Sequence, residues 1–288
     1  MRKVVAISKT SLMFLLDRRN GKPIFPVEER PVPQSDVPGE HSWPTQPFPV
    51  APPPLARLSM TDAEVFKGEP EHEKFCRDLV EKMGGSVNSK GPFTPYSDKE
   101  YRVIFPGQQG GANYGGVAVD PALGYVVVNT RDVAGLGMLV KQASGSPAYR
   151  RQTPLEGGQG SFYSRFWNPD TLMSCQQPPW ASLIAVNANT GQIAWNVPLG
   201  INEAMEAKGI HNTGAFGQGG PITTAGGLVF IAGTNDRYFR AFDTKTGAEL
   251  WRVKLDSEGH TNPMTFQGAD GKQYVAIVSS GISVFALP

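Results

Sequence analysis

Four side chains in this sequence could bind a ligand because of their type and their place beside apolar or glycine-rich runs. Lys9 follows the apolar run at residues 3–7, and Asn129 ends another apolar run. Tyr114 precedes a Gly-Gly pair, and Gln218 lies within the run Phe-Gly-Gln-Gly-Gly. An ammonium group stabilises negative charge, and an amide both donates and accepts hydrogen bonds. Each residue also has an ordinary structural explanation, as an exposed turn residue, a strand-ending amide or a core aromatic ring.

The residue types that bind metals do not form a site in the sequence. Calcium takes about six to eight oxygen ligands, and the carboxylates here are not clustered at ligand spacing. The histidines are scattered without the spacing of a zinc site: His41, His72, His211 and His260. The only cysteines, Cys76 and Cys175, could form a disulfide or stay as two buried thiols. We expect the fold to bring them close enough to bridge.

The composition favours a folded chain with many turns. The 288 residues are 40% hydrophobic and 18% charged, which is enough apolar material for a sizeable core. The 33 glycines and 25 prolines lie among short apolar runs, a distribution that indicates turns rather than disorder. The formal net charge of +1 predicts no nucleic-acid surface. No apolar run approaches the roughly 20 residues that span a bilayer.

The first residues only briefly look like a secretion signal. A basic start precedes a short apolar run, but Ser-Lys-Thr at residues 8–10 interrupts it and Asp17 follows soon after. There is no small-residue cleavage site. We therefore predict two strands, at residues 3–7 and 12–16, joined by a turn, and no targeting segment within this chain.

The most informative pattern is a repeat of an apolar strand, an Asp or Asn, three residues, a glycine and a second strand. Its copies run from Asp17 to Gly21, Asp120 to Gly124, Asn187 to Gly191 and Asp243 to Gly247. In the last two copies a tryptophan, Trp195 or Trp251, follows the glycine by four residues.

This repeat predicts an all-β fold built from similar hairpins. An Asp or Asn side chain accepts hydrogen bonds from its own turn, and glycine takes the positive φ that closes it. Hairpins repeated in this way indicate a β-propeller of antiparallel four-stranded blades. Tryptophans at a fixed offset would pack between neighbouring sheets, so we expect Trp195 and Trp251 to be buried. The alternative is a β-sandwich with unrelated hairpins.

Two segments depart from the repeat. The proline-rich residues 22–57 predict an extended loop packed across one face. Residues 61–83 are the predicted helix, because Thr61 and Glu64 resemble a capping box ahead of an apolar stripe. That stripe would contain Phe66, Phe75, Leu79 and Met83. Residues 141–175 predict a second long excursion between blades.

The sequence resembles the dehydrogenases that depend on pyrroloquinoline quinone (PQQ), specifically the glucose, quinate and shikimate group. A generic propeller would share the turns and the tryptophans, but not the proline-rich segment. The resemblance is carried by residues 17–23 (DRRNGKP), 26–33 (PVEERPVP), 44–48 (PTQPF), 105–107 (FPG), 115–121 (GGVAVDP), 219–230 (GGPITTAGGLVF), 262–265 (NPMT) and 271–275 (GKQYV).

The resemblance implies about half of an eight-bladed propeller, the C-terminal half. Residues 1–288 would be one partial domain, with the proline-rich loop and a short helix inserted at about 22–90. The catalytic aspartate and the calcium ligands of the family would lie upstream of Met1, so we expect Met1 to be a truncation point or a misassigned start. By the same resemblance, the enzyme is periplasmic and oxidises a sugar, polyol or other alcohol, with a quinone or cytochrome c as electron acceptor.

The resemblance also implies roles for the candidate side chains. Lys9 corresponds to a lysine that contacts the quinone, and Asn129 to an asparagine that contacts the cofactor. We expect both to face the same axial channel. Tyr114 stands where many relatives carry a tryptophan and could border the quinone, and Gln218 opens an inner strand at the channel.

One departure and two other functions stay open. Relatives have a glycine-rich loop before the closing strand, whereas here Ser-Ser-Gly at residues 279–281 leads directly into residues 282–288. This shortening puts full activity in doubt. The chain could instead be a non-catalytic propeller that binds proteins, as in outer-membrane assembly, or a fragment without activity of its own.

Overall fold

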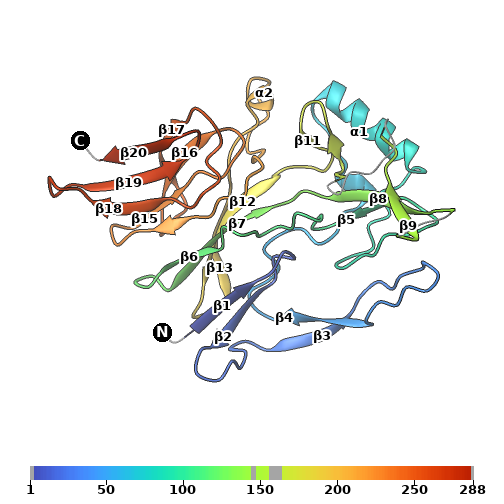
Figure 1. Cartoon of the computed structure of the whole chain (residues 1–288), viewed down its shortest axis with the longest axis horizontal. Helices are drawn as coiled ribbons and strands as arrows, with labels where there is room; N and C mark the ends of the chain where they lie inside the picture. The colour runs from blue at the N-terminus through green and yellow to red at the C-terminus, as the bar shows by residue number, and fades with distance from the viewer. Residues whose placement is uncertain (1–2, 144–146, 156–163, 287–288) are drawn as a thin grey trace.

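The computed structural model describes residues 3–143, 147–155 and 164–286. Antiparallel sheets follow one another along the chain and stand side by side in an arc (Figure 1). The first four-stranded sheet has the order β13-β12-β7-β6. Its strands are β6 (Val117–Asp120), β7 (Tyr125–Arg131), β12 (Ala181–Asn187) and β13 (Gln192–Pro198).

The other sheets of the arc flank this one. The next sheet is also four-stranded, and its strands are in chain order: β14 (Ile222–Thr223), β15 (Leu228–Ile231), β16 (Tyr238–Asp243) and β17 (Glu249–Lys254). A three-stranded sheet follows, with β18 (Met264–Gln267), β19 (Gln273–Val278) and β20 (Ile282–Ala286). On the other side lies a two-stranded sheet, β1 (Lys3–Ile7) and β2 (Met13–Asp17).

Separate apolar clusters join each sheet to the next, as in propeller blades. Alternate residues of a strand face opposite sides. Val126 and Val128 of β7 therefore pack toward Met13 and Leu15, whereas Val127 packs toward the following sheet. A further cluster links that sheet to the three-stranded one through Phe239, Leu255, Val275 and Ile277. This radial stacking confirms the predicted β-propeller fold and excludes two facing sheets.

The repeated turns are equivalent in three of their four copies. The N–H groups of Gly21, Gly191 and Gly247 donate back to the carbonyls of Asp17, Asn187 and Asp243, at 2.8, 2.8 and 2.9 Å. All three glycines have positive φ. The Asp120 copy instead joins β6 to β7, the first two strands of its sheet. The chain then leaves that sheet and returns at β12.

The two repeated tryptophans differ in burial. Trp195 is 8% exposed, lies against Gly247 of the next sheet, and donates from Nε1 to the carbonyl of Thr244 at 2.9 Å. Trp251 is 38% exposed, so its predicted burial is wrong. It contacts the ring of Phe285 edge-on. It stays partly exposed because the three-stranded sheet beyond it offers, within the described residues, no repeat turn to cover it.

The proline-rich segment contains a hairpin, which corrects the prediction of an extended loop. β3 (Val27–Pro31) pairs with β4 (Thr45–Pro49) in an isolated two-stranded sheet. Proline is tolerated on the edge of a sheet, and both strands here are edges.

The predicted helix is also shorter than expected. The capping box forms, with Glu64 accepting from the N–H of Thr61 at 2.7 Å, but it starts only the 3₁₀ turn η1 (Asp62–Glu64). Gly68 has a φ of 126°, which is not helical, and the helix α1 (Pro70–Lys82) begins only after it.

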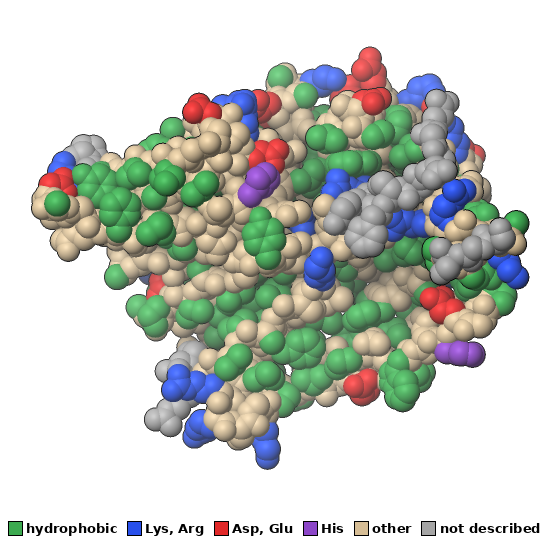
Figure 2. All heavy atoms as spheres, in the orientation of Figure 1, with side chains coloured by type: hydrophobic (Ala, Val, Ile, Leu, Met, Phe, Trp, Pro, Cys, Tyr) green, Lys and Arg blue, Asp and Glu red, His purple; other side chains and the backbone are tan. Residues whose placement is uncertain are grey.

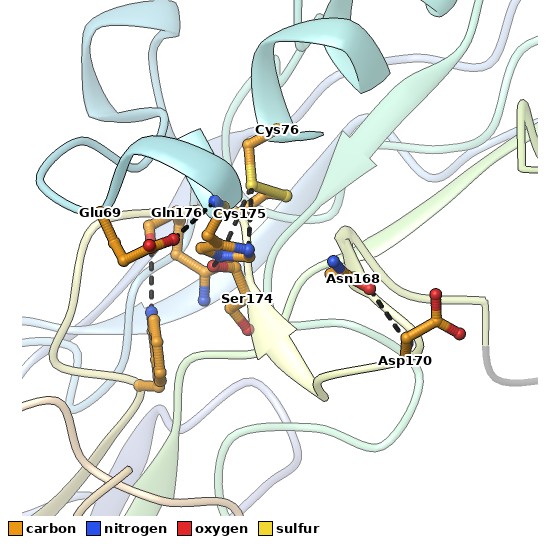
Figure 3. Close-up of a disulfide and its surroundings, with 9 residues drawn as sticks. Glu69, Cys76, Asn168, Asp170, Ser174, Cys175 and Gln176 are labelled. Carbon is orange, nitrogen blue, oxygen red and sulfur yellow. Dashed lines mark hydrogen bonds between the residues drawn. A yellow bond between two sulfur atoms is a disulfide. The ribbon is translucent and has the colours of Figure 1, made fainter. Parts of the chain in front are cut away.

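The excursion between β7 and β12 packs with α1 into the largest apolar cluster. The disulfide Cys76–Cys175 lies inside it with a Cα–Cα distance of 5.3 Å, which confirms that the cysteines bridge (Figure 3). The remaining elements are β5 (Arg102–Ile104), β8 (Gly135–Lys141), β9 (Tyr149–Gln152), β10 (Trp167–Asn168), β11 (Met173–Ser174) and α2 (Glu203–Glu206). No helix in the described part of the chain is long and apolar enough to cross a membrane.

Candidate functional site

The first strands of neighbouring sheets meet at a crowded inner edge. Thr223 of β14 donates from its hydroxyl group to the carbonyl of Val119 on β6 at 2.8 Å. Just before these strands, a Cβ atom at Gly115 would collide with the backbone of Gly220. Only glycine allows backbones to approach this closely. The inner edge is therefore the narrow end of the blades, where a propeller has its axis.

One segment, residues 107–116, crosses this inner edge, and we refer to it as the rim segment. At one end its Gly111 N–H donates to the carbonyl of Lys9 at 2.8 Å. At the other, the Tyr114 hydroxyl donates to the carbonyl of His260 at 2.7 Å, and Asn262 Nδ2 donates to the carbonyl of Gly115 at 2.8 Å. The rim segment thus connects the two-stranded sheet with the three-stranded one.

Lys9 lies in the turn between β1 and β2 and is exposed. Its Nζ is 3.5 Å from the carbonyl oxygen of Gln108, a long hydrogen bond that leaves most of its donor capacity free. Its stem packs on Gly110, where a Cβ atom would lie only 2.6 Å from the Cβ of Lys9. The position of the ammonium group is therefore tied to the rim segment.

Asn129 and Arg131 lie near the end of β7, where Arg131 contacts the rim segment. They occupy one face of the strand, since side chains alternate along it. Asn129 is 9% exposed, and its amide makes no hydrogen bond to any described residue. The N–H of Arg131 donates to the carbonyl of Gly111 at 3.1 Å.

Tyr114 and Gln218 lie at the other end of the rim segment. Tyr114 is 64% exposed, so it is not a core aromatic. Gln218 is half-buried between Gly217 and Gly219, whose backbones pack against Gly233. Its side chain makes no hydrogen bond to a described residue, and it stands two residues before the contact of Gly220 with the rim segment.

Arg131 is the residue that the sequence reasoning missed. Its side chain is 3% exposed and donates from Nη2 to the carbonyls of Gln109 and Gly110, at 3.0 and 3.4 Å. Burial, and then the like charge of Arg165, lower the pKa of the Arg131 guanidinium to about 10. The available signal was its spacing, two residues after Asn129 on the same strand face.

Two cations contact the rim segment, Lys9 and Arg131. Neither Lys9 nor Arg131 pairs with a carboxylate among the described residues. Figure 2 shows Lys and Arg side chains near the middle of the face that it draws, with Asp, Glu and His side chains beside them. Ammonium, guanidinium and unpaired amide groups together suit a planar quinone that carries carboxylates, which needs both cations and hydrogen-bond donors.

The described residues do not supply a carboxylate site for calcium. The group of metal-ligand type among them is His72 with Cys76 and Cys175, and the two sulfur atoms are bonded to each other. Calcium prefers oxygen ligands, so this group does not fit it.

The geometry defines a partial propeller whose inner edge carries ligand-binding side chains, and comparisons identify its family. The family model described as the β-propeller domain of PQQ glucose, ethanol and alcohol dehydrogenases matches residues 1–275. The chain therefore belongs to the PQQ-dependent β-propeller dehydrogenases, as the resemblance predicted.

Curated relatives that match nearly the whole chain are also dehydrogenases by name. The glycerol dehydrogenase large subunit of Gluconobacter oxydans is 34% identical over 95% of this chain and 39% of its own length. The quinoprotein glucose dehydrogenase of Escherichia coli is 32% identical over 98% of this chain and 37% of its own length. The chain thus spans well under half the length of these relatives.

Solved structures confirm the fold. The quinohemoprotein alcohol dehydrogenase from Comamonas testosteroni matches with a TM-score of 0.54, at 19% identity, over 96% of this chain and 32% of that one. At this identity the likeness shows the propeller architecture alone.

Proposed function

We propose that this chain forms one wall of the PQQ site in a periplasmic dehydrogenase that oxidises a sugar, polyol or other alcohol and passes electrons to a quinone or cytochrome c. The observation that carries the proposal is the contact of Lys9 and Arg131 with the rim segment, with no carboxylate partner among the described residues and with Asn129 two residues before Arg131 on the same strand. Family membership supports the cofactor. The buried disulfide suits an oxidising compartment such as the periplasm.

The chain's own side chains would bind and orient the cofactor. PQQ, when bound, supplies the chemistry of accepting electrons from the alcohol. The Lys9 ammonium group would stabilise negative charge on a quinone oxygen. The Asn129 amide would donate to or accept from a polar group of the same ligand. Tyr114 and Gln218 would border the same ligand from the other end of the rim segment.

We further propose that the base that removes the alcohol proton, and the calcium ligands, belong to the upstream part of the relatives, which this chain does not match. A positioned base typically contributes about 10²–10⁴-fold to the rate. On this proposal the isolated chain holds part of a site and does not catalyse turnover.

A dye-linked oxidation assay tests the proposed function. The purified 288-residue chain with PQQ and calcium should not oxidise glucose, glycerol or quinate. The same chain joined to the upstream part of a relative should oxidise at least one of these three substrates. Turnover by the isolated chain would contradict the assignment of the base. The absence of turnover and of PQQ binding in the joined protein would instead favour a protein-binding scaffold.

A further inference from the structure

Arg131 differs from the other deeply buried arginines of the fold. Arg102 and Arg240 are 2% and 1% exposed, and each contacts two carboxylates. Arg102 pairs with Asp36 at 2.7 Å and Glu100 at 2.9 Å. Arg131 is 3% exposed and forms no ion pair with a described residue. Among the described residues, the two other deeply buried guanidinium groups are thus neutralised by carboxylates and that of Arg131 is not.

Part of the hydrogen-bonding capacity of Arg131 is unused. A guanidinium group carries five N–H donors in a planar fork. Only Nη2 makes side-chain hydrogen bonds to described residues, to the carbonyls of Gln109 and Gly110. Nε and Nη1 have no partner there. The rim segment thus holds the fork through Nη2 and leaves Nε and Nη1 without a partner among the described residues.

The charged neighbour of Arg131 increases the need for an anion. Arg165, of like sign, acts on it, and the Arg165 guanidinium lies 4.3 Å from the centre of the Trp167 ring. A buried cation without a counter-ion is costly, and a second cation nearby adds to that cost. A ligand that brings negative charge to Arg131 would relieve the cost of burying its guanidinium group.

We propose that Arg131 binds a carboxylate group of the small molecule that occupies the rim site. The inference rests on the proposed function and deepens it. A carboxylate matches the fork because it accepts two parallel N–H bonds from a guanidinium group. The carboxylate has two sources, the cofactor, whose ring system carries carboxylates, or an alcohol substrate that is a hydroxy acid. The same contact serves both, and the experiment separates them.

The experiment measures ligand binding by the 288-residue chain and its variants by equilibrium dialysis. The test variants are Arg131→Gln, which removes the charge, and Arg131→Lys, which keeps the charge but loses the fork. Arg18→Gln, at an exposed arginine of the Asp17 turn, is the matched control. The probes are PQQ, its trimethyl ester, and the pairs glycerate with glycerol and gluconate with glucose, each pair in the presence of PQQ.

If the cofactor supplies the carboxylate, Arg131→Gln weakens PQQ binding by about tenfold to a hundredfold and leaves binding of the ester unchanged. Arg131→Lys should fall between these values. If the substrate supplies it, PQQ binding is unchanged, and the variant loses preference for the hydroxy acids over the neutral polyols. A structural role alone would weaken PQQ and its ester equally.

Equal binding of every probe by wild type and Arg131→Gln would overturn this inference and leave the proposed function standing. Failure of the wild type to bind PQQ, with or without calcium, would remove the proposed function. A difference between acids and polyols at Arg131 would still support the carboxylate contact in that case. If thermal unfolding shows that Arg131→Gln does not fold, Arg131→Lys is compared with wild type in its place, by the same binding measurements.

Discussion

Lys9 and Arg131 are joined through the backbone of a single residue. The N–H of Gly111 donates to the carbonyl of Lys9 at 2.8 Å, and its carbonyl accepts from the N–H of Arg131 at 3.1 Å. The two cations come from different sheets and are 122 positions apart in the chain. Their relative position therefore depends on Gly111.

Substitution of Gly111 by alanine should disturb both cations. A Cβ atom there would collide with the hydroxyl of Ser11, which accepts from the N–H of Ala112 at 2.9 Å. We expect Gly111→Ala to lower the free energy of unfolding by about 1–3 kcal/mol, the usual cost of overpacking, and to weaken PQQ binding. Gly226→Ala is the control, because its nearest neighbour is Thr224 Oγ1 at 3.9 Å. Equal urea stability of the two variants would contradict this account.

The two tryptophans should differ in their contribution to stability. Trp195→Ala removes a buried ring between two sheets and its hydrogen bond to Thr244, so we expect a loss of about 3–5 kcal/mol in urea unfolding. Trp251→Ala should cost less, since that ring is 38% exposed. An equal or larger loss for Trp251→Ala would show that the sheets are not stacked as described.

The disulfide should stabilise the excursion against unfolding. Cys76 and Cys175 are separated by 99 residues, and in the chain-entropy model a loop of that length contributes about 4–5 kcal/mol at most. We expect the double variant Cys76→Ala, Cys175→Ala to unfold at clearly lower urea concentration. Thiol titration of the denatured wild type should find no free thiol. Detection of two thiols would contradict the bridge.

Stability should decrease at mildly acid pH because of His72. Burial lowers its pKa, and the hydrogen bond to the Ser174 carbonyl and the charge of Glu69 oppose this shift. The unfolded chain therefore takes up a proton at higher pH than the folded one. The contribution is fully present above the ordinary pKa of about 6.5 and is lost as pH falls below it, by at most about 1.4 kcal/mol per pH unit.

The measurement is the urea stability of wild type and His72→Gln between pH 7 and pH 5. The decrease should be smaller in the variant. His41→Gln, at an exposed histidine, is the control and should follow the wild type. Parallel curves for all three proteins would rule out His72 as the cause.

Local sequence patterns predicted the blades, whereas contacts between segments distant in sequence became known only from the structure. The Asp-to-Gly turns are formed by their own residues, as in Asp243 and Gly247, so their spacing was sufficient. The exposure of Trp251 depends on what the next sheet offers, and the β3–β4 hairpin on a pairing across 13 intervening residues, Pro31 to Thr45 being its inner pair.

The candidate site shows the same division. Lys9 and Asn129 were named by resemblance, and their shared role at the cofactor stays a prediction; Lys9 contacts the rim segment and Asn129 lies two residues before Arg131 on β7. Arg131 was missed because an arginine after an apolar strand is usually a solvated end, and its spacing from Asn129 is a weak signal by itself. Its importance comes from the carbonyls of Gln109 and Gly110 and from the absence of an acid partner among the described residues, and neither is encoded locally.

The most direct test of the central claim is equilibrium dialysis of PQQ against the 288-residue chain. Lys9→Ala and Asn129→Ala are compared with Lys272→Ala, which replaces an exposed lysine of the β18–β19 turn. We predict weak but saturable binding by the wild type and the control, and at least about tenfold weaker binding by the other two variants. Binding by Lys9→Ala and Asn129→Ala as tight as by Lys272→Ala, or no saturable binding by the wild type, would contradict the claim that the rim segment and its neighbours form a wall of the cofactor site.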